Sequence, residues 1–387
     1  HKKPAQNLTI VSGLWNINKE GRSFDQYKDA FNDFLKIPQK MILFIPKELE
    51  KFVWDRRSKD STSVVIFELE DIKNLFDPFW DDVQSIRQDS NWYNSTGEGG
   101  WLSSSPQAVN QWYNPIVMSK YSLLNTACCY NNFNTDYFLW VDAGLSSTVN
   151  HVLMDERDVF SKIEKYLNPF LFLSYPYETS TEIHGFRIES MNNIAKDSVS
   201  YVCRGGLFGG HKDFITQGNE AYWSLLKNTL SSGHMGTEES IFTLMAYLDP
   251  HLYRRYSLDA NGLVTKFLQE LDSNGEVSLE EVPNNRKAPK PVFSDISHVK
   301  TNLYFLTFNY PDQLEYTIAS LSEHNGFMDR PHQKVIIDNS TNDQARIDNK
   351  KICDKYGFEH IIQEKNSGIC GGRQRVAEHF HDSDSDF

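Results

Sequence analysis

The sequence predicts an α/β protein with a mixed, mostly parallel sheet flanked by helices, followed by a second, partial α/β domain. Short β-branched, apolar runs alternate with segments whose apolar residues have helical spacing. The apolar runs are almost continuous, which is typical of parallel strands buried on both faces. A polar, proline-containing segment interrupts this alternation, which then starts again.

In the first domain, residues 1–271, the pattern predicts each element in turn. Residues 24–35 are predicted to be a helix because Tyr27, Phe31, Phe34 and Leu35 repeat with a helical period. Residues 91–111, rich in Ser, Gly, Asn and Trp, predict a loop. The other predicted elements are strands at 8–13, 41–45, 63–67, 137–141, 170–175 and 201–208, and helices at 115–129 and 240–248.

Residues 272–300 are predicted to be a linker, and residues 301–387 a second, incomplete domain. The linker is polar, contains three prolines and has no periodicity. After it, the pattern predicts strands at 303–308, 334–337 and 360–362, a helix at 314–321 and a helix end at 352–356. Because only about 85 residues follow the linker, we expect this domain to lack part of its catalytic machinery.

The net charge and the cysteines indicate which partners and which cellular compartment to expect. The formal net charge is −13, and no long Lys/Arg run is present, so we expect no nucleic-acid partner. Five cysteines without metal-ligand spacing favour a reduced, cytoplasmic setting. Sequons at Asn7, Asn94 and Asn339 leave secretion as the alternative. No apolar run is long enough for a transmembrane span.

Asp142 directly follows the apolar strand at 137–141 and is therefore predicted at the carboxyl edge of the sheet, where open α/β folds bind ligands. A carboxylate there could hold Mg²⁺ or Mn²⁺ against a diphosphate. The alternative is a turn-forming aspartate before Gly144.

A glycine-rich segment, RGGLFGGH, runs from Arg204 to His211. Gly205 and Gly206 would allow a ligand to approach the backbone, and Arg204 or His211 could meet a phosphate or a metal. The alternatives are a bulge or a tight turn.

Three further polar features are candidates: a pair of glutamates, Lys120 and His184. Thr237 is predicted to cap a helix whose first turn carries Glu238 and Glu239. One glutamate could deprotonate an acceptor hydroxyl, although the helix dipole alone favours acids here. Lys120 could contact a donor phosphate or simply be exposed, and His184 could contact a sugar or a metal or be structural.

Five segments, in order, resemble the HtrL/YibB family of bacterial proteins over about residues 7–260: IVSGLWNI with Arg22 and Tyr27, NPIVMSKYSLL, FLWVDAGLS, RGGLFGG and GTEES. That family is grouped with GT-A-type glycosyltransferases and associated with surface-polysaccharide synthesis. The resemblance implies a Rossmann-like nucleotide-sugar fold with Asp142 at the metal and diphosphate position. Gly144 replaces the second acid of the usual D-x-D, so His211, His184 or the diphosphate itself would have to share the ion. The alternative is a reaction that needs no metal.

Together, motifs and resemblance predict a glycosyltransferase that uses a UDP-sugar and a glycan or lipid-linked glycan acceptor, in the cytoplasm or at the inner face of the membrane. Predicted catalytic residues are Glu238 and Glu239, predicted metal ligands Asp142 and His211, and predicted sugar or acceptor contacts His184 and Trp140. Predicted donor-binding residues are Ser12, Gly13, Arg22, Lys120, Asp142, Gly144, Arg204, Gly205 and Gly206. The alternatives are a non-catalytic carbohydrate-binding or scaffold protein and another nucleotide-dependent transferase, such as a nucleotidyltransferase.

The second segment, with YFLTFNYPDQLEYTIASL, KVIIDNSTND and NSGICGGR, resembles the amino-terminal half of a family 2 glycosyltransferase. The resemblance implies nucleotide contacts from Asp338 and Arg373. Asn366, Gly368 and Arg373 match the following helix-start motif of that family. Residues 382–384 spell D-x-D, but no apolar strand precedes them, so we expect a solvated loop.

Overall fold

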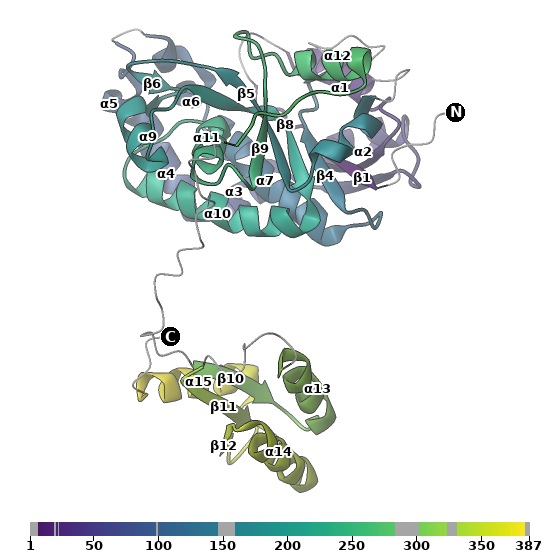
Figure 1. Ribbon diagram of the computed structural model, residues 1–387, viewed down its shortest axis with the longest axis vertical. Helices are drawn as coiled ribbons and strands as arrows, with labels where there is room; N and C mark the ends of the chain where they lie inside the picture. The colour runs from purple at the N-terminus through teal and green to yellow at the C-terminus, as the bar shows by residue number, and fades with distance from the viewer. Residues whose placement is uncertain are drawn as a thin grey trace. The chain divides into compact units, whose positions relative to one another are not determined.

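The computed structural model describes residues 7–18, 21, 23–97, 100–145, 159–282, 302–322 and 331–383. The chain forms two compact units, His1–Pro289 and Lys290–Phe387, each of which is described by itself (Figure 1). No helix within the described ranges is both long and apolar enough to cross a membrane.

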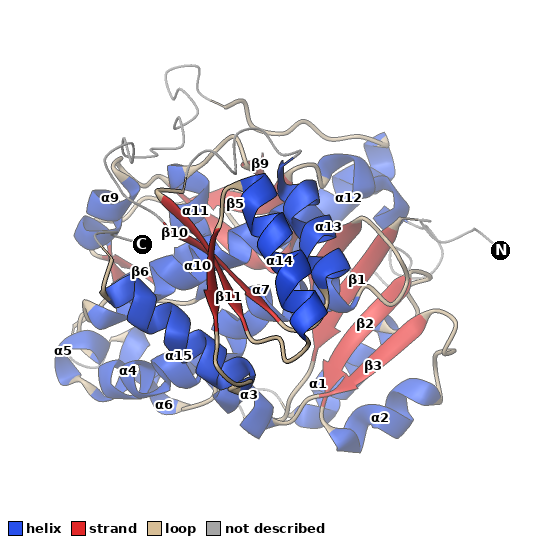
Figure 2. Cartoon of the chain, turned by 90° about the horizontal axis from the view of Figure 1, so that it is seen from below, coloured by secondary structure: helices blue, strands red, loops and turns tan. Residues whose placement is uncertain are grey.

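A seven-stranded sheet forms the centre of the first unit, in the order β3-β2-β1-β4-β8-β5-β9 within the described residues. Its strands are β1 (Leu8–Gly13), β2 (Lys40–Ile45), β3 (Thr62–Ile66), β4 (Tyr137–Val141), β5 (Phe170–Pro176), β8 (Tyr201–His211) and β9 (Tyr253–Ser257). Figure 2 shows β1, β2 and β3 side by side, and their pairings are parallel. The carboxyl ends of β1 and β4 therefore meet at one edge, since β1 also pairs with β4 in parallel.

Strand β8 is the exception to the parallel arrangement, because it pairs antiparallel with both β4 and β5. Strand β9 pairs with β5 in parallel. The expectation of an α/β protein with a mixed, mostly parallel sheet is confirmed.

Helices cover both faces of this sheet. They are α1 (Phe24–Phe34), α2 (Lys47–Trp54), α3 (Leu69–Leu75), α4 (Asp77–Gln88), α5 (Ser90–Tyr93), α6 (Pro106–Val109), α7 (Tyr113–Tyr130), α9 (Ile188–Ala195), α10 (Lys212–Ser231), α11 (Glu238–Leu248) and α12 (Val264–Asn274). Short 3₁₀ helices η1 (Trp101–Ser104), η3 (Val159–Lys162) and η4 (Glu164–Tyr166) and a small hairpin, β6 (Glu182–Ile183) with β7 (Phe186–Arg187), complete the described elements.

Alternate residues along each strand enter two separate hydrophobic cores. One core packs the strands against α3, α4, α7, α10 and α11, and the other packs them against α1, α2 and α12. In β4, Trp140 faces the first core and Leu139 the second. Burial on both faces explains why the strands are almost continuously apolar.

The structure differs from the sequence-based expectations at several elements. Residues 91–111 contain the short helices α5, η1 and α6 rather than an uninterrupted loop. Helix α12 continues to Asn274, within the predicted linker, and the Glu280 backbone N–H donates to the Arg255 carbonyl at 2.8 Å. Helices α2, α3, α4, α9, α10 and α12 and strand β9 had no predicted counterpart, although apolar residues recur at helical spacing in α2, α4, α9 and α12.

The second unit has a three-stranded parallel sheet, in the order β10-β11-β12 within the described residues. Its elements are β10 (Asn302–Thr307), α13 (Pro311–Ser322), β11 (Gln333–Asp338), α14 (Asp343–Tyr356), β12 (Glu359–Ile362) and α15 (Gly368–His381). Asp382 directly follows α15, and residue 384 lies outside the described residues.

Candidate functional site

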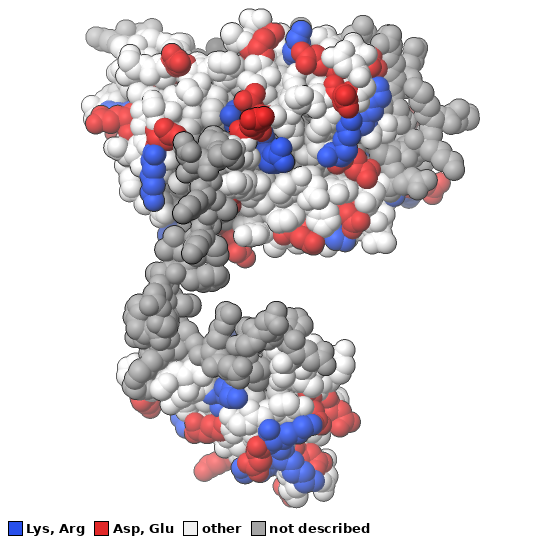
Figure 3. Space-filling view, viewed as in Figure 1, with Lys and Arg blue, Asp and Glu red and all other residues white. Residues whose placement is uncertain are grey.

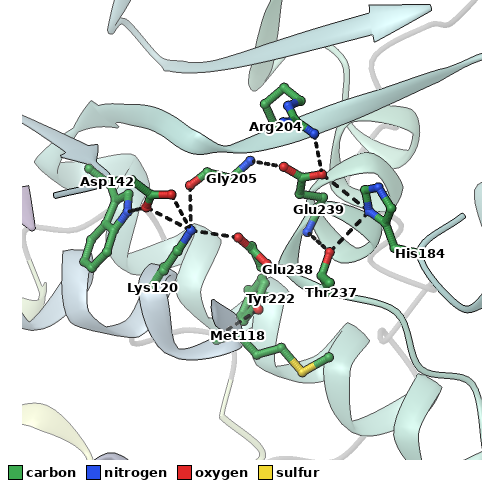
Figure 4. A network of polar contacts seen from close by, with 11 residues as sticks. Met118, Lys120, Asp142, His184, Arg204, Gly205, Tyr222, Thr237, Glu238 and Glu239 are labelled. Carbon is green, nitrogen blue, oxygen red and sulfur yellow. Dashed lines mark hydrogen bonds and ion pairs between the residues drawn. The ribbon is translucent and has the colours of Figure 1, made fainter. Parts of the chain in front are cut away.

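A pocket of about 660 Å³ opens at the carboxyl edge of the large sheet, next to the end of β4. Side chains from α7, β8 and the start of α11 meet there, together with Asp142 after β4 and His184 from the β6–β7 turn (Figure 4). Its lining comprises Trp101, Ser104, Ser105, Pro106, Gln107, Tyr113, Val117, Lys120, Asp142, His184, Arg204, Gly205, Gly206, Thr237, Glu238, Glu239 and Val264.

Lys120 joins three parts of the fold at the inner wall of this pocket. Its Nζ lies 2.9 Å from Asp142 Oδ1 and 3.1 Å from Asp142 Oδ2. It donates to Glu238 Oε1 at 2.9 Å and to the Gly205 carbonyl at 3.1 Å. Although its residue type suggested an exposed helix position as the alternative, Lys120 is only 8% exposed.

Gly205 separates two groups of charges (Figure 4). Its carbonyl accepts from Lys120, and its N–H donates to Glu239 Oε1 at 2.8 Å. A Cβ at this position would overlap the Glu238 carboxylate, with Glu238 Cγ at 2.9 Å. Glycine at this position therefore lets Glu238 reach Lys120. The sequence had suggested a different reason for the glycine, namely that a ligand approaches the backbone there.

The second group of charges is centred on Glu239. Arg204 Nη1 donates to Glu239 Oε2 at 3.0 Å, and His184 Nδ1 lies 3.4 Å from the same oxygen. Thr237 caps α11 by accepting from the Glu239 N–H at 3.3 Å, as the sequence predicted. His184 and Gly185 both have positive φ, so they form the tight turn that brings the imidazole to this group.

Burial and neighbouring charges shift the pKa values of Glu238 and Lys120 within the first group of charges, which also contains Asp142. Burial, with additional contributions from the Glu239 and Asp142 charges, raises the pKa of Glu238 to about 7 against the opposing effect of Lys120. Burial alone would lower the pKa of Lys120, but the Asp142 and Glu238 carboxylates outweigh it and hold that pKa above its ordinary value. A carboxyl group that titrates near neutrality is suited to proton transfer.

A smaller, largely apolar pocket of about 150 Å³ adjoins the charged one, because Tyr113 and Val117 line both. Gly13, Leu14, Trp15, Asn16, Ile17, Phe24, Tyr27 and Ile116 form the rest of its wall. The two pockets together offer aromatic surface beside charged groups, a combination that fits a ligand with a flat ring and a polar part.

The structure separates His211 from Asp142. His211 pairs with Tyr137 at the start of β4, whereas Asp142 follows the end of that strand. At about 3.3 Å per residue, the two positions are roughly 16 Å apart along the strand. The prediction that His211 shares a metal with Asp142 is therefore wrong, because β8 runs antiparallel to β4. His211 instead caps α10 by accepting from the Asp213 N–H at 3.3 Å.

Trp140, a predicted sugar contact, and Ser12, a predicted donor contact, are both buried. Trp140 is 2% exposed, and its Nε1 donates to Asp142 Oδ1 at 2.8 Å, so it orients the carboxylate and cannot stack on a sugar. Ser12 is fully buried and donates to the Val141 carbonyl at 2.6 Å, which ties β1 to β4. Both predictions were wrong for one reason: alternate strand residues point into the cores rather than toward the edge.

The remaining predicted donor residues have mixed outcomes. Gly13 lines the small apolar pocket rather than the charged one. Gly144 lies in the turn closed by the Leu145 N–H and the Asp142 carbonyl at 2.9 Å and is not part of the pocket wall. Arg22 lies outside the described residues.

The residues present do not fit the divalent ion that the sequence predicted. Both oxygens of Asp142 are already bonded, one of them to Trp140 and each of them to Lys120. Across the described ranges, no group of three or more His, Cys, Asp or Glu side chains is arranged to hold a metal ion. The ammonium of Lys120 stands where an ion bridging Asp142 and Glu238 would have to bind.

Sequence reasoning missed several pocket residues. Trp101 and Gln107 come from the segment predicted as a loop, and Tyr113 from the first turn of α7. The two tryptophans of that segment, Trp92 and Trp101, were a signal, since solvent-exposed loops seldom need large rings. Trp101 donates to Glu182 Oε1 at 3.2 Å, which ties this wall to the hairpin that carries His184.

In the second unit, Asp338 does not face a ligand site. It is fully buried and accepts from the Ser340 N–H, Asn349 and His360 at 2.8–2.9 Å. Burial alone would raise the pKa of Asp338, but these hydrogen bonds lower it to about 2. The predicted nucleotide contact from Asp338 is therefore wrong, because its acceptor capacity is used inside the fold.

An apolar pocket of about 680 Å³ lies elsewhere in the second unit, at the end of β10. Asn366 and Gly368, which match the helix-start motif, line this pocket, while Arg373 is exposed outside it. Arg373, the other predicted nucleotide contact, therefore does not join Asn366 and Gly368 in the wall of this pocket.

Surface charge is mixed on the face drawn in Figure 3. Lys and Arg side chains there alternate with Asp and Glu, and the described residues form no broad basic patch on that face. Nucleic-acid binding depends on such a patch.

The fold and the pocket define an α/β protein with a charged ligand pocket at the carboxyl edge of its sheet. The sequence model of HtrL_YibB, described as a bacterial protein of unknown function, matches residues 5–260. The chain belongs to the HtrL_YibB family. The match includes the large sheet and almost the whole pocket wall. No curated protein matched the sequence.

Proposed function

We propose that this protein is a glycosyltransferase that transfers a sugar from a nucleoside diphosphate sugar, foremost a UDP-sugar, to a hydroxyl group of a glycan or lipid-linked glycan. The observation that carries the proposal is the charged pocket, where Lys120, Asp142 and Glu238 meet Arg204 and Glu239. Its place at the carboxyl edge of a mostly parallel sheet agrees with the GT-A-type fold that the sequence resemblance implies.

The two adjoining pockets suit the two parts of such a donor. The aromatic wall, with Trp15, Tyr27 and Tyr113, offers flat surfaces for a nucleobase. Arg204 lines the charged pocket, and its guanidinium group can pair with a diphosphate. Its positive charge would stabilise the leaving group as the bond between the sugar and the diphosphate breaks.

Glu238 is the proposed base. The acceptor oxygen bonds to the anomeric carbon as the bond from that carbon to the diphosphate oxygen breaks, and the hydroxyl proton passes to Glu238. Its pKa of about 7 leaves a large fraction of carboxylate at neutral pH and still makes it a competent base. In this scheme Glu239 binds the sugar, Arg204 binds the diphosphate, and Asp142 aligns the sugar ring.

Three further points belong to the proposal. Synthesis of a surface polysaccharide is the proposed role, in the cytoplasm or at the inner face of the membrane. Residues 301–387 are proposed to correspond to the amino-terminal half of a family 2 glycosyltransferase. Parallel pairing of β10, β11 and β12 and the pocket at the end of β10 support that correspondence.

The test is a transfer assay on the full chain with a panel of UDP-sugars, with and without Mn²⁺, that measures UDP release and the mass of the acceptor. Asp142→Asn should lose transfer by roughly 100-fold or more, since an oriented polar group at the reacting centre is worth about that much. His211→Gln, at the far end of the same strand pair, is the control and should retain activity.

Full activity of Asp142→Asn would refute the assignment. Release of pyrophosphate in place of UDP would indicate a nucleotidyltransferase. Saturable sugar binding without turnover of any donor would favour the non-catalytic carbohydrate-binding protein.

A further inference from the structure

The ammonium group of Lys120 is surrounded by oxygen atoms of the kind that usually bind a metal ion. Its Nζ lies within 3.1 Å of four oxygen atoms: both carboxylate oxygens of Asp142, Oε1 of Glu238 and the Gly205 carbonyl. Carboxylate and backbone carbonyl oxygens are the ligands that hard divalent cations take in proteins. An ammonium group has three N–H donors, so these four oxygens saturate it.

The surrounding fold is built to keep that ammonium in place. Helix α7 buries Lys120, and the carboxylates of Asp142 and Glu238, on two other parts of the fold, each form an ion pair with its ammonium at 2.9 Å. Gly205 lacks the Cβ that would push Glu238 away. A dication at the same oxygens would lie within a few ångströms of this fixed positive charge, and at such distances the repulsion is large.

We propose that Lys120 is the resident cation of the pocket, standing in the place of a divalent metal ion, and that a nucleoside diphosphate binds there without a metal. The inference rests on the proposed function for the identity of that ligand. Arg204, the other cation of the pocket wall, then meets the free diphosphate. Because the cation belongs to the chain, removal of the Lys120 charge should convert the pocket into a metal site.

The first experiment measures Mn²⁺ alone against the full chain, by calorimetry or by electron paramagnetic resonance. The wild-type protein should show no Mn²⁺ site that depends on Asp142. Lys120→Met, whose side chain is one atom shorter and carries no charge, should bind Mn²⁺ at least roughly tenfold more tightly than the wild-type protein does, since two carboxylates and a carbonyl are left as oxygen ligands. Adding Asp142→Asn to Lys120→Met should remove that gain.

Lys212→Met is the matched control, because Lys212 forms an ion pair with Asp136 at 2.7 Å near the start of β4, away from the pocket. It should leave Mn²⁺ binding at the wild-type level. If Lys120→Met fails to fold, the Mn²⁺ titrations of the wild-type protein and of Asp142→Asn still test the inference. A Mn²⁺ site in the wild-type protein that is lost in Asp142→Asn overturns the inference, and the lack of such a site supports it.

The second experiment follows thermal unfolding with UDP and UDP-sugars, in EDTA or in Mn²⁺. At 100 times its Kd, a ligand should raise the midpoint by roughly 5 °C, and by the same amount in both buffers. A shift seen only with Mn²⁺ overturns the inference. If no UDP compound shifts the midpoint in either buffer, the proposed function loses its support, while the Mn²⁺ titrations still decide the role of Lys120.

Discussion

Lys120 on α7 and Glu238 at the start of α11 lie 118 residues apart in the sequence, and their charged groups meet at 2.9 Å. Both side chains are at least nine-tenths buried. A buried ion pair gives little net stability, yet removal of one partner leaves an uncompensated charge in the interior. The pair therefore holds the inner wall of the pocket in one arrangement. Substitutions of neighbouring residues should act by keeping or breaking this contact between Lys120 and Glu238.

Glu238→Gln should change how stability depends on pH. Because the folded pKa of Glu238 is raised from 4.5 to about 7, the folded state binds more protons than the unfolded state between these values. The free energy of unfolding should therefore fall as pH rises through this window, by an amount on the order of 3 kcal/mol. In Glu238→Gln this part of the pH dependence should vanish.

Urea denaturation at a series of pH values between 4.5 and 8 measures this effect. Glu220→Gln, an exposed position on α10, controls for the loss of one carboxylate. A wild-type stability that rises across the window, relative to Glu238→Gln, would contradict the raised pKa.

Gly205→Ala and Gly206→Ala should differ sharply although the positions are adjacent. A Cβ at Gly205 would overlap the Glu238 carboxylate, whereas at Gly206 its nearest neighbour would be Val264 Cγ2 at 3.5 Å, an ordinary contact. We expect Gly205→Ala to break the contact between Glu238 and Lys120 and to cost about 1–3 kcal/mol of stability. Gly206→Ala should cost under about 0.5 kcal/mol.

Chemical denaturation of the two variants side by side gives the comparison. Equal stability of the two would mean that Glu238 is free to move away from Lys120 at no cost.

Trp140→Phe tests whether Trp140 orients Asp142 or contacts the sugar. Loss of the Nε1 hydrogen bond to Asp142 removes a bond to a charged group, worth about 1.5–3 kcal/mol, so kcat should fall by roughly 10- to 100-fold. The KM for the acceptor should stay unchanged, since the indole is buried. Steady-state kinetics with varied acceptor separate the two roles, and a raised acceptor KM with intact kcat would restore the sugar contact.

Asp338→Asn should destabilise the second unit. The folded pKa of Asp338 lies below its ordinary value of 3.8, so its stabilising effect is present above that pH and is lost as pH falls toward 2. At neutral pH we expect a loss of about 2–3 kcal/mol, because buried donors lose their charged partner. Asp343→Asn, on the exposed first turn of α14, should cost under about 0.5 kcal/mol.

Hydrogen exchange followed by mass spectrometry is the suitable measurement, because all eight tryptophans lie before residue 224 and fluorescence would not report on this unit. Faster exchange in peptides of β11 is expected for Asp338→Asn alone. Unchanged exchange there would argue against a structural role for the buried carboxylate.

The sequence was sufficient for features that depend on local patterns. Strand β1, helix α1 and strand β4 were predicted within a residue or two, because β-branched runs and helical spacing act over short windows. The cap at Thr237 was predicted for the same reason. Asp142 could be placed at the sheet edge because a polar residue directly after a buried strand lies there whatever the rest of the fold does.

Only the tertiary structure decided where each side chain points and which other side chains it contacts. The antiparallel course of β8 brings Arg204 and Gly205 to the pocket and takes His211 to the other end of β4. Strand direction and order depend on packing between segments far apart in the sequence, which no local pattern encodes. The same packing buries Lys120, a residue type that is exposed in most helices, because two distant carboxylates meet it there.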